Sequence, residues 1–246
     1  MESTPTEQNI LVLIPCSKRK NPLDQETKKF LPSQSHGAYS DLPNIENLRN
    51  ELLKLVSNSK ELAERDENKN GILNPGSPYI KAIKLYNGNF YKNEVKKLIE
   101  NLSDNRSNIR VLIISAFYGI AKPDEYLKVY NLRMDDKLNT VDKDLNRAYK
   151  FWEKNALWET LYNYIELNNI YFVWSLLPKS YHRIFSSLWD KLKEEGIKCC
   201  HVNVPNAGNR TSYKKAEWLK SFLKSNNDIS KINESGFNYD PCYTYL

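Results

Sequence analysis

Residues that can bind an anion or attack a carbon atom follow the first apolar run of the chain directly. The run covers residues 10–14. It is followed by Pro15, Cys16, Ser17, Lys18, Arg19 and Lys20. The backbone N–H groups of such a turn, together with a lysine, can cradle a phosphate or a carboxylate, and nearby cations lower the pKa of a cysteine thiol. The alternative is a small buried cysteine that closes a strand. The turn lacks the Gly-x-x-x-x-Gly-Lys-Ser/Thr pattern, which disfavours hydrolysis of nucleoside triphosphates.

A second polar element follows the apolar run at residues 109–114. It contains Ser115, Phe117, Tyr118, Gly119, Asp124 and Glu125, and Tyr130 and Asn131 continue the aromatic and polar alternation. The aromatic pair can form a flat slot for a planar ring, and a carboxylate can act as a general base or hydrogen-bond the edge of a ring. The alternative is a β-turn at Lys-Pro-Asp-Glu with solvated acids.

Two more apolar runs end in cations that open a helix. The run at 170–174 leads to His182 and Arg183, and the run at 199–204 leads to Asn209 and Arg210. The free N–H groups at the start of a helix favour an anion. The alternatives are a structural histidine in the first case and a simple N-cap in the second.

Four short apolar runs separated by helical patterns predict an α/β protein with a parallel or mostly parallel sheet. Ligands bind at the carboxyl ends of the strands in such sheets, so the four strand ends predict one shared site. We expect a flexible N-terminus at residues 1–9 and a single α/β domain at 10–223, with a long insertion near 21–78. A polar tail at 224–246 completes the expected organisation.

The composition is that of a globular protein. The chain has 246 residues, of which 40% are hydrophobic, enough for a sizeable core. No apolar run approaches the roughly 20 residues that span a bilayer, and the first nine residues lack the layout of a signal peptide. The four cysteines (Cys16, Cys199, Cys200 and Cys242) show no zinc-type spacing. We interpret them as reduced thiols of a cytoplasmic protein, and predict neither a metal nor a cofactor.

The charge and the aromatic content allow a nucleic-acid partner without requiring one. Thirty-six basic and 30 acidic residues give a net charge of +6, which permits a polyanionic partner but also fits a lysine-rich solvated surface. Sixteen tyrosines and five tryptophans accompany the cations. Aromatic rings beside cations suit base stacking next to phosphate contacts, although we expect most of these rings in the core.

Together the motifs resemble those of the YaaA-like group of bacterial and phage proteins. The resemblance rests on the turn at 15–20 and on the element from Ser115 to Glu125 with its Tyr130-Asn131-Leu132 extension, and the Leu85-Tyr86-x-Gly88-x-Phe90 segment between them also fits. Pro15-Cys16-x-x-x-Lys20 also resembles a motif of archaeosine synthase. The serine and histidine that follow the lysine there correspond here only across an insertion, at residues 32–36.

The resemblance implies a three-layer core, with helices on both faces of the sheet, similar to the uracil-DNA-glycosylase fold. It implies a nucleic-acid base-processing enzyme, which we expect to be a DNA glycosylase that cleaves the N-glycosidic bond of a modified base, for instance in defence against phages with modified DNA. Such an enzyme takes the base out of the stack and holds the flanking phosphates. The alternatives are a non-catalytic YaaA-type DNA-binding stress protein and a nucleoside or nucleotide base transferase.

The glycosylase hypothesis assigns each candidate residue a role. Asp124 or Glu125 stabilises the positive charge on the sugar or orients the attacking water. The base is held by Cys16, Ser17, Ser115, Phe117, Tyr118, Gly119, Tyr130 and Asn131. The phosphates or the departing base are held by Lys18, Lys20, His182, Arg183, Asn209 and Arg210.

Overall fold

The structure is a computed structural model. It describes residues 9–21, 41–57, 77–92, 94–102, 108–138, 140, 142–225 and 236–244. Residues 1–8 of the expected N-terminus, most of the expected insertion and part of the expected tail lie outside the described residues.

The described residues form a six-stranded sheet, in agreement with the predicted α/β class. Its strand order is β4-β3-β1-β6-β7-β8. The strands are β1 Asn9–Pro15, β3 Ile109–Ser115, β4 Gly119–Ala121, β6 Ile170–Ser175, β7 Lys198–Asn203 and β8 Asn238–Pro241. The four strands predicted from the apolar runs are mutually parallel, and β4 and β8 add antiparallel edges. The sheet is therefore mostly parallel, as predicted.

Strand β1 lies near the centre of this sheet because its side chains are apolar on both faces. Residues 10–14 are buried, which is typical of a parallel strand covered by helices on both sides. Val12 lies opposite Val111 of β3 and Trp174 of β6. The parallel register places Pro15 beside Ile114, so the turn after β1 lies next to the turn after β3.

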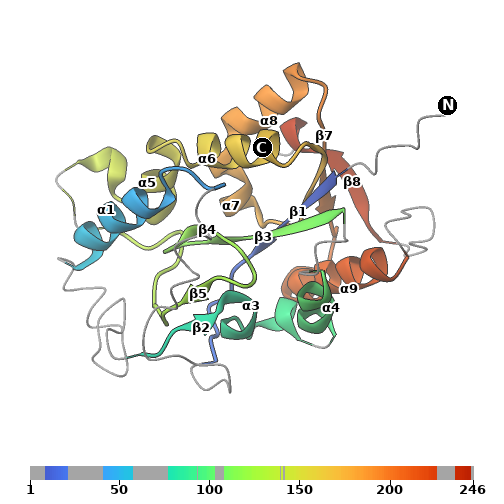
Figure 1. Ribbon diagram of the computed structural model, residues 1–246, viewed down its shortest axis with the longest axis horizontal. Helices are drawn as coiled ribbons and strands as arrows, with labels where there is room; N and C mark the ends of the chain where they lie inside the picture. The colour runs from blue at the N-terminus through green and yellow to red at the C-terminus, as the bar shows by residue number, and fades with distance from the viewer. Residues whose placement is uncertain are drawn as a thin grey trace.

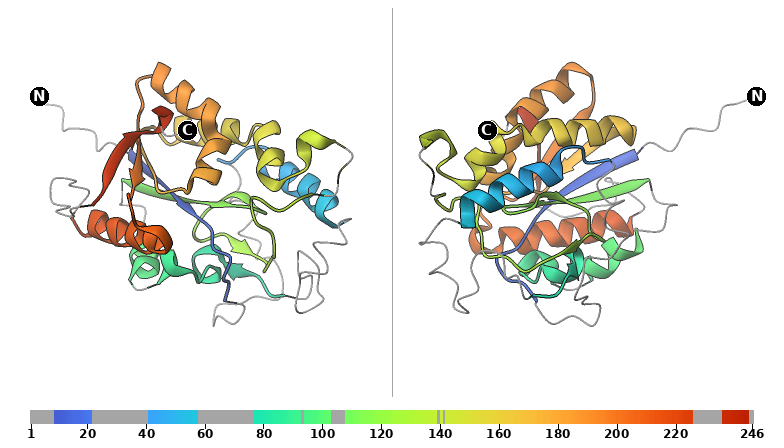
Figure 2. Two further views of the ribbon diagram at one scale, coloured as in Figure 1. Left: turned by 180° about the vertical axis from the view of Figure 1, so that it is seen from behind. Right: turned by 60° about the vertical axis from the view of Figure 1, so that its left-hand side comes forward.

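Helices cover both faces of the sheet (Figure 1 and Figure 2). One face carries α1 Ile45–Ser57, α5 Ala148–Lys154, α6 Leu157–Leu167 and α8 Ser186–Glu194, with the short α7 Lys179–His182 after β6. The other face carries α3 Ala82–Leu85, α4 Val95–Asn101 and α9 Thr211–Lys224. The predicted layering of helices on both faces is confirmed. Two further strands, β2 Ile80–Lys81 and β5 Tyr126–Leu127, pair with each other outside the main sheet.

Several short elements differ from the sequence prediction. Helices α5 and α6 are separate because the chain turns at Ala156, whose φ of 49° lies in the left-handed region. Strands β2, β4 and β5 have only two or three residues each, too few to show a period of two in the sequence.

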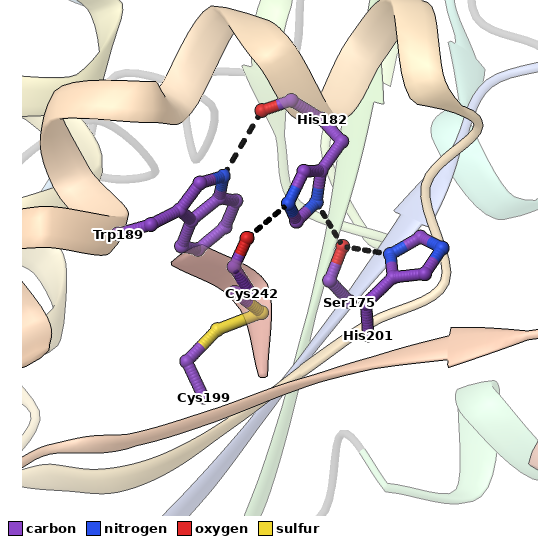
Figure 3. The surroundings of a disulfide bond; sticks show 6 residues. All are labelled: Ser175, His182, Trp189, Cys199, His201 and Cys242. Carbon is purple, nitrogen blue, oxygen red and sulfur yellow. Dashed lines mark hydrogen bonds between the residues drawn. A yellow bond between two sulfur atoms is a disulfide. The ribbon is translucent and has the colours of Figure 1, made fainter. Parts of the chain in front are cut away.

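A disulfide bond joins Cys199 of β7 to Cys242 (Figure 3). The expectation of four reduced thiols is therefore wrong for this pair, whereas Cys16 and Cys200 are free cysteines. The physical reason is β8, which runs antiparallel to β7 and carries Cys242 back to the sheet. The two Cα atoms are 5.5 Å apart although the cysteines are 43 positions apart in the sequence. The described end of the expected tail is thus part of the sheet.

The structure gives no candidate for a membrane-spanning helix within the described residues.

Candidate functional site

A cavity of about 130 Å³ lies at the carboxyl ends of β1 and β6. Residues from the turns after these strands, from the turn before α4 and from the start of α9 line it. They are Pro15, Cys16, Phe90, Leu176, Pro178, Tyr181, Thr211, Ser212 and Lys215. A cavity of roughly 150 Å³ accepts benzene, so this one has room for about one six-membered ring. The ends of two of the four predicted strands, β1 and β6, therefore border one cavity, and Cys16 is the one predicted site residue among those that line it.

Cys16 borders this cavity beside a set of buried tyrosines. Its thiol lies 3.3 Å from the Tyr181 hydroxyl. Tyr91 donates a hydrogen bond to the Pro15 carbonyl at 2.7 Å, which fixes the end of β1. Burial raises the pKa of Tyr91 and of Tyr181 well above the usual value. These phenols therefore stay neutral and act as hydrogen-bond donors or acceptors.

Lys20 holds the turn after β1 in place. Its amine donates to the Ser17 carbonyl at 3.2 Å and lies 3.9 Å from the centre of the Tyr130 ring. Burial lowers its pKa to about 8, an effect that the nearby Cys16 opposes. Lys20 thus contributes a cation–π contact and a backbone hydrogen bond within its own turn.

The glycine of the Leu85-Tyr86-x-Gly88-x-Phe90 segment makes room for this turn. A Cβ atom at Gly88 would lie 2.2 Å from the Ser17 hydroxyl oxygen. The neighbouring Asn87 donates its N–H to the Arg19 carbonyl at 2.9 Å. The segment and the turn after β1 therefore form one packed unit, which explains why the two motifs occur together in this sequence.

The aromatic residues after β3 pack into the core instead of forming an open slot. Phe117 is 3% exposed and stacks on Tyr130 with ring centres 5.5 Å apart. The Tyr118 hydroxyl hydrogen-bonds the backbone of Lys128. Gly119 has a φ of 66°, and a Cβ atom there would lie 2.9 Å from the Trp152 ring. The predicted base slot at residues 117–119 is thus filled by the protein's own side chains.

Ser115 and Tyr130 connect this aromatic cluster to the end of β3. The Ser115 hydroxyl accepts the Tyr118 N–H at 3.0 Å and lies 2.9 Å from the Tyr130 hydroxyl. Tyr86 lies 3.2 Å from Tyr130 by their hydroxyl oxygens. These groups are buried beneath Lys20, and Asn131 follows them as a half-buried residue. The hydrogen-bonded hydroxyl groups of Ser115, Tyr86 and Tyr130 therefore lie under the turn that carries Lys20.

The two predicted catalytic carboxylates lie elsewhere. Glu125 is 2% exposed, and Arg49 of α1 binds its carboxylate with a shortest distance of 2.5 Å. The second Glu125 oxygen also accepts the Lys122 N–H at 3.2 Å. Arg49 donates further to the Tyr118 and Ile120 carbonyls. Through Arg49, Glu125 therefore links α1 to the segment after β3. The position of Glu125 in the sequence motif did not indicate this structural role.

Asp124 is exposed and borders a second cavity, of about 260 Å³, together with Arg110 and Lys122. Arg110 stands at the amino end of β3, whereas Ser115 ends the strand at the site. Because β4 runs antiparallel to β3, the chain returns to that amino end before it reaches Asp124. Asp124 is thus at the opposite end of β3 from the Cys16 cavity.

The predicted phosphate-binding residues divide into exposed and buried ones. Lys18, Arg183, Asn209 and Arg210 are exposed in the turns after β1, β6 and β7. Arg183 also lies over the Tyr149 ring, 4.3 Å from its centre. His182 is fully buried, and both of its ring nitrogens are hydrogen-bonded within the protein. The expected contact of His182 with a phosphate is therefore corrected to an internal structural role.

His182 belongs to a buried polar chain that reaches the cavity. Its Nε2 lies 2.9 Å from the Cys242 carbonyl, and its Nδ1 lies 3.1 Å from the Ser175 hydroxyl (Figure 3). The same hydroxyl lies 3.3 Å from Nδ1 of His201. Nε2 of His201 lies 3.2 Å from the amine of Lys215, which borders the cavity.

The pKa values of these groups are lowered by burial. The pKa of His182 falls to about 4 and that of His201 to about 2, and the charge of Lys215 adds to the effect of burial on both. Burial lowers the pKa of Lys215 to about 7. Both imidazoles are therefore neutral near pH 7, and a large share of Lys215 is the free amine.

Lys215 and His201 are site residues that the sequence analysis missed, and one signal could have found Lys215. It stands at helical spacing with Trp218, Leu219 and Phe222 on the buried side of α9. A lysine on an apolar stripe is rarely buried without a function or a partner. No comparable pattern marks His201, whose contacts depend on the packing of α9 against β7.

Within the described ranges, no group of three or more histidine, cysteine or acidic residues is arranged to hold a metal ion.

Comparison with known proteins gives the family. The model of the family described as "Peroxide stress protein YaaA" matches residues 10–241. A UPF0246 protein of Malacoplasma penetrans (strain HF-2) is 24% identical over 243 residues, 97% of this chain and 88% of that protein. A UPF0246 protein of Francisella tularensis subsp. tularensis (strain WY96-3418) is 22% identical over 209 residues, 79% of each chain. The family match covers nearly the whole sheet and every residue of the cavity, and the chain therefore belongs to the peroxide stress protein YaaA family.

Proposed function

We propose that this protein is a nucleic-acid base-processing enzyme, a DNA glycosylase that cleaves the N-glycosidic bond of a modified base. The observation that carries the proposal is the ring-sized cavity at the carboxyl ends of the parallel strands, bordered by a thiol, a phenol and a buried lysine. A base taken out of the DNA stack needs a pocket of this kind.

The cavity offers hydrogen-bonding groups at one side and apolar contacts at the other. Cys16 and Tyr181 can bond the edge of a ring, while Phe90 and Leu176 can pack on its face. A pocket that combines apolar walls with a few polar groups is typical of small-ligand sites. We propose that a single six-membered ring, such as a modified pyrimidine, occupies it.

The exposed cations of the neighbouring turns suit the phosphates on either side of the extracted base. Lys18 follows β1, Lys179 and Arg183 follow β6, and Arg210 follows β7. Cations that neutralise phosphates supply most of the sequence-independent affinity for DNA. DNA is thus the proposed partner, and phage DNA with modified bases is the proposed source of the substrate.

Two resemblances fit the proposal. A core similar to uracil-DNA glycosylase would place its ligand at the carboxyl edge of a parallel sheet, where the cavity lies. The Pro15-Cys16-x-x-x-Lys20 pattern, similar to that of archaeosine synthase, contributes Cys16 to the cavity wall and Lys20 to the turn beneath it. Glu125 has no role in the proposed reaction, because Arg49 and the Lys122 N–H engage its oxygens.

A second candidate function is DNA binding without catalysis. It is favoured by one observation: none of the cavity-lining residues among those the structure describes is an aspartate or a glutamate. A hydrolase that uses a carboxylate to stabilise the sugar cation would need one there. A binding protein would need only the cations and the pocket.

Mass spectrometry of released bases separates the two functions. The protein is incubated with genomic DNA from phages that carry different modified bases, and the free bases are identified. We expect free base and abasic DNA from at least one source. Ser212→Trp, which fills the mouth of the cavity, should abolish most of the release, whereas Ser187→Trp on the exposed side of α8 should not. Retention of DNA with no base released from any source would favour the binding function.

A further inference from the structure

The buried polar chain behind the cavity has only one possible direction. The Cys242 carbonyl can only accept, so Nε2 of His182 donates to it and Nδ1 of His182 accepts from Ser175. The Ser175 hydroxyl, having given its hydrogen to His182, accepts from Nδ1 of His201. Nε2 of His201 is then an acceptor, and Lys215 donates to it.

This direction determines what the Lys215 amine can offer to the cavity. One N–H is donated to His201 at 3.2 Å and a second to the Leu177 carbonyl at 2.9 Å. The residue is 4% exposed and lies on the cavity wall. A neutral amine has two hydrogens and one lone pair, so the two bonds use both hydrogens and leave the lone pair for a ligand.

We propose that Lys215 is the nucleophile of the site and forms an imine with C1′ of the deoxyribose whose base the cavity has taken up. This inference rests on the proposed function, and it supplies the group that the reaction needs in the absence of a carboxylate on the cavity wall. Lys215 is then the catalytic residue, while His201, Ser175 and His182 are positioning residues.

The reaction balances without an oxidant or a reductant. The lone pair of the Lys215 amine attacks C1′, and the bond from C1′ to the base breaks with its electron pair on the base. A proton from the attacking nitrogen goes to the departing base. The sugar ring then opens, its oxygen takes the second proton, and an imine between the lysine nitrogen and C1′ results. One water molecule hydrolyses this imine to the free amine and the aldehyde of the abasic site.

The surroundings of Lys215 support this role. A lysine is a nucleophile only as the free amine, and burial lowers the pKa of Lys215 to about 7. Its hydrogen-bond partners, a carbonyl and a neutral imidazole, carry no negative charge that would favour the ammonium form. The chain ends on a carbonyl, which cannot pass a proton onward, so it orients the amine and does not conduct protons.

Lys20 is a half-buried lysine near the same turn, and its contacts differ. Its amine donates to two backbone carbonyls of its own turn and lies over the Tyr130 ring. It is not among the residues that line the cavity. Lys20 is therefore the internal comparison for any test of Lys215.

Reductive trapping tests the inference. The full-length protein is mixed with a DNA duplex that holds one preformed abasic site, and sodium cyanoborohydride reduces any imine to a stable amine. The protein–DNA adduct is digested, and the modified lysine is located by mass spectrometry. We expect the adduct on Lys215, its complete loss in Lys215→Met, and its retention in Lys214→Met, which alters the exposed neighbour on α9.

Each outcome bears on the inference. An adduct on Lys20 or another lysine, or no adduct with the wild-type protein, would overturn it. The wild-type mapping needs no variant, so a Lys215→Met protein that fails to fold does not remove the test. The abasic site is made beforehand, so an adduct on Lys215 without base release from any modified DNA would contradict the proposed function alone.

Discussion

At the scale of the residue, burial gives two charged side chains opposite roles. Glu125 is buried against the cation of Arg49, and its oxygens are engaged. Lys215 is buried against His201 and a carbonyl, neither of which neutralises an ammonium. A paired buried charge stabilises a structure only while its partner remains, whereas a lysine without an anion changes its pKa. We therefore place the chemistry at Lys215 and a structural role at Glu125.

Replacement of Glu125 tests this division. Glu125→Gln leaves the buried Arg49 without its anion, and the loss of one partner of such a pair costs about 3–5 kcal/mol. We expect a large fall in the free energy of unfolding, measured by urea denaturation, with base release retained at temperatures where the variant is folded. Glu159→Gln, an exposed acid on α6, should change neither. Lost base release at unchanged stability would return the catalytic role to Glu125.

The sequence predicted the identity of some site residues and misplaced others. Cys16 borders the cavity because it follows an apolar run at once, where only the next turn determines its position. His182 and residues 117–119 were misassigned because their burial depends on helices distant in the sequence. Tertiary packing decides whether a histidine or an aromatic ring faces a cavity or the core. The spacing of residues within one segment does not determine that packing.

At the scale of the element, β8 closes one edge of the sheet and fixes the polar chain. It pairs with β7, and the disulfide holds the Cys242 segment beside His182 (Figure 3). The segment is thus linked to the cavity through four hydrogen-bonded side chains.

Loss of the disulfide should destabilise the protein. A cross-link across 43 positions removes about 4 kcal/mol of loop entropy from the unfolded chain in the simplest treatment. Cys199→Ser and Cys242→Ser should therefore lower the urea midpoint, and a reductant should do the same to the wild type. Cys200→Ser, at a free cysteine on the same strand, serves as the control. A wild-type midpoint that a reductant leaves unchanged would show that the bond contributes no stability.

The elements of the sheet centre were predictable, and those of its edges were not. Strands β1, β3, β6 and β7 contain the four short apolar runs and alternate with helices, and their parallel arrangement follows from that alternation. Strand β8 reads Asn-Tyr-Asp-Pro, which carries no apolar pattern. It forms a strand because its backbone pairs with the edge of β7. That edge exists only once the sheet has assembled.

At the scale of the whole molecule, Lys215 should make stability depend on pH. Its pKa is lowered from 10.5 to about 7, so above pH 7 the unfolded chain binds more protons than the folded one. The free energy of unfolding therefore rises with pH through this window, by an amount on the order of 5 kcal/mol if the whole shift is expressed. His201, which faces the amine, stays neutral here.

Urea denaturation between pH 7 and pH 9 measures how the free energy of unfolding depends on pH. This range lies below the pH at which tyrosine side chains lose their proton. Lys215→Met should reduce the increase of the free energy of unfolding with pH, whereas Lys214→Met should leave that increase unchanged. Part of the rise should persist above pH 8, because the pKa of Lys20 is also lowered. A rise of equal steepness in wild type and Lys215→Met would mean that Lys215 is protonated in the folded protein.

The basic turns around the cavity predict that DNA affinity falls with salt. Arg210 is exposed beside the start of α9, and each phosphate contact contributes about 0.9 to the slope of log affinity against log salt. Arg210→Ala should reduce that slope by about this amount in fluorescence anisotropy. Lys198→Ala, an exposed cation at the opposite end of β7, should not. Equal slopes for all three proteins would place the DNA on another surface.

The central claim is that the cavity beside Cys16 and Lys215 removes a base from DNA. The most direct measurement is the amount of free base and of abasic sites produced from one modified DNA by the wild type, Lys215→Met and Lys214→Met. We expect equal amounts of the two products from the wild type and from Lys214→Met, and none from Lys215→Met. Base release by Lys215→Met at the wild-type rate would contradict it.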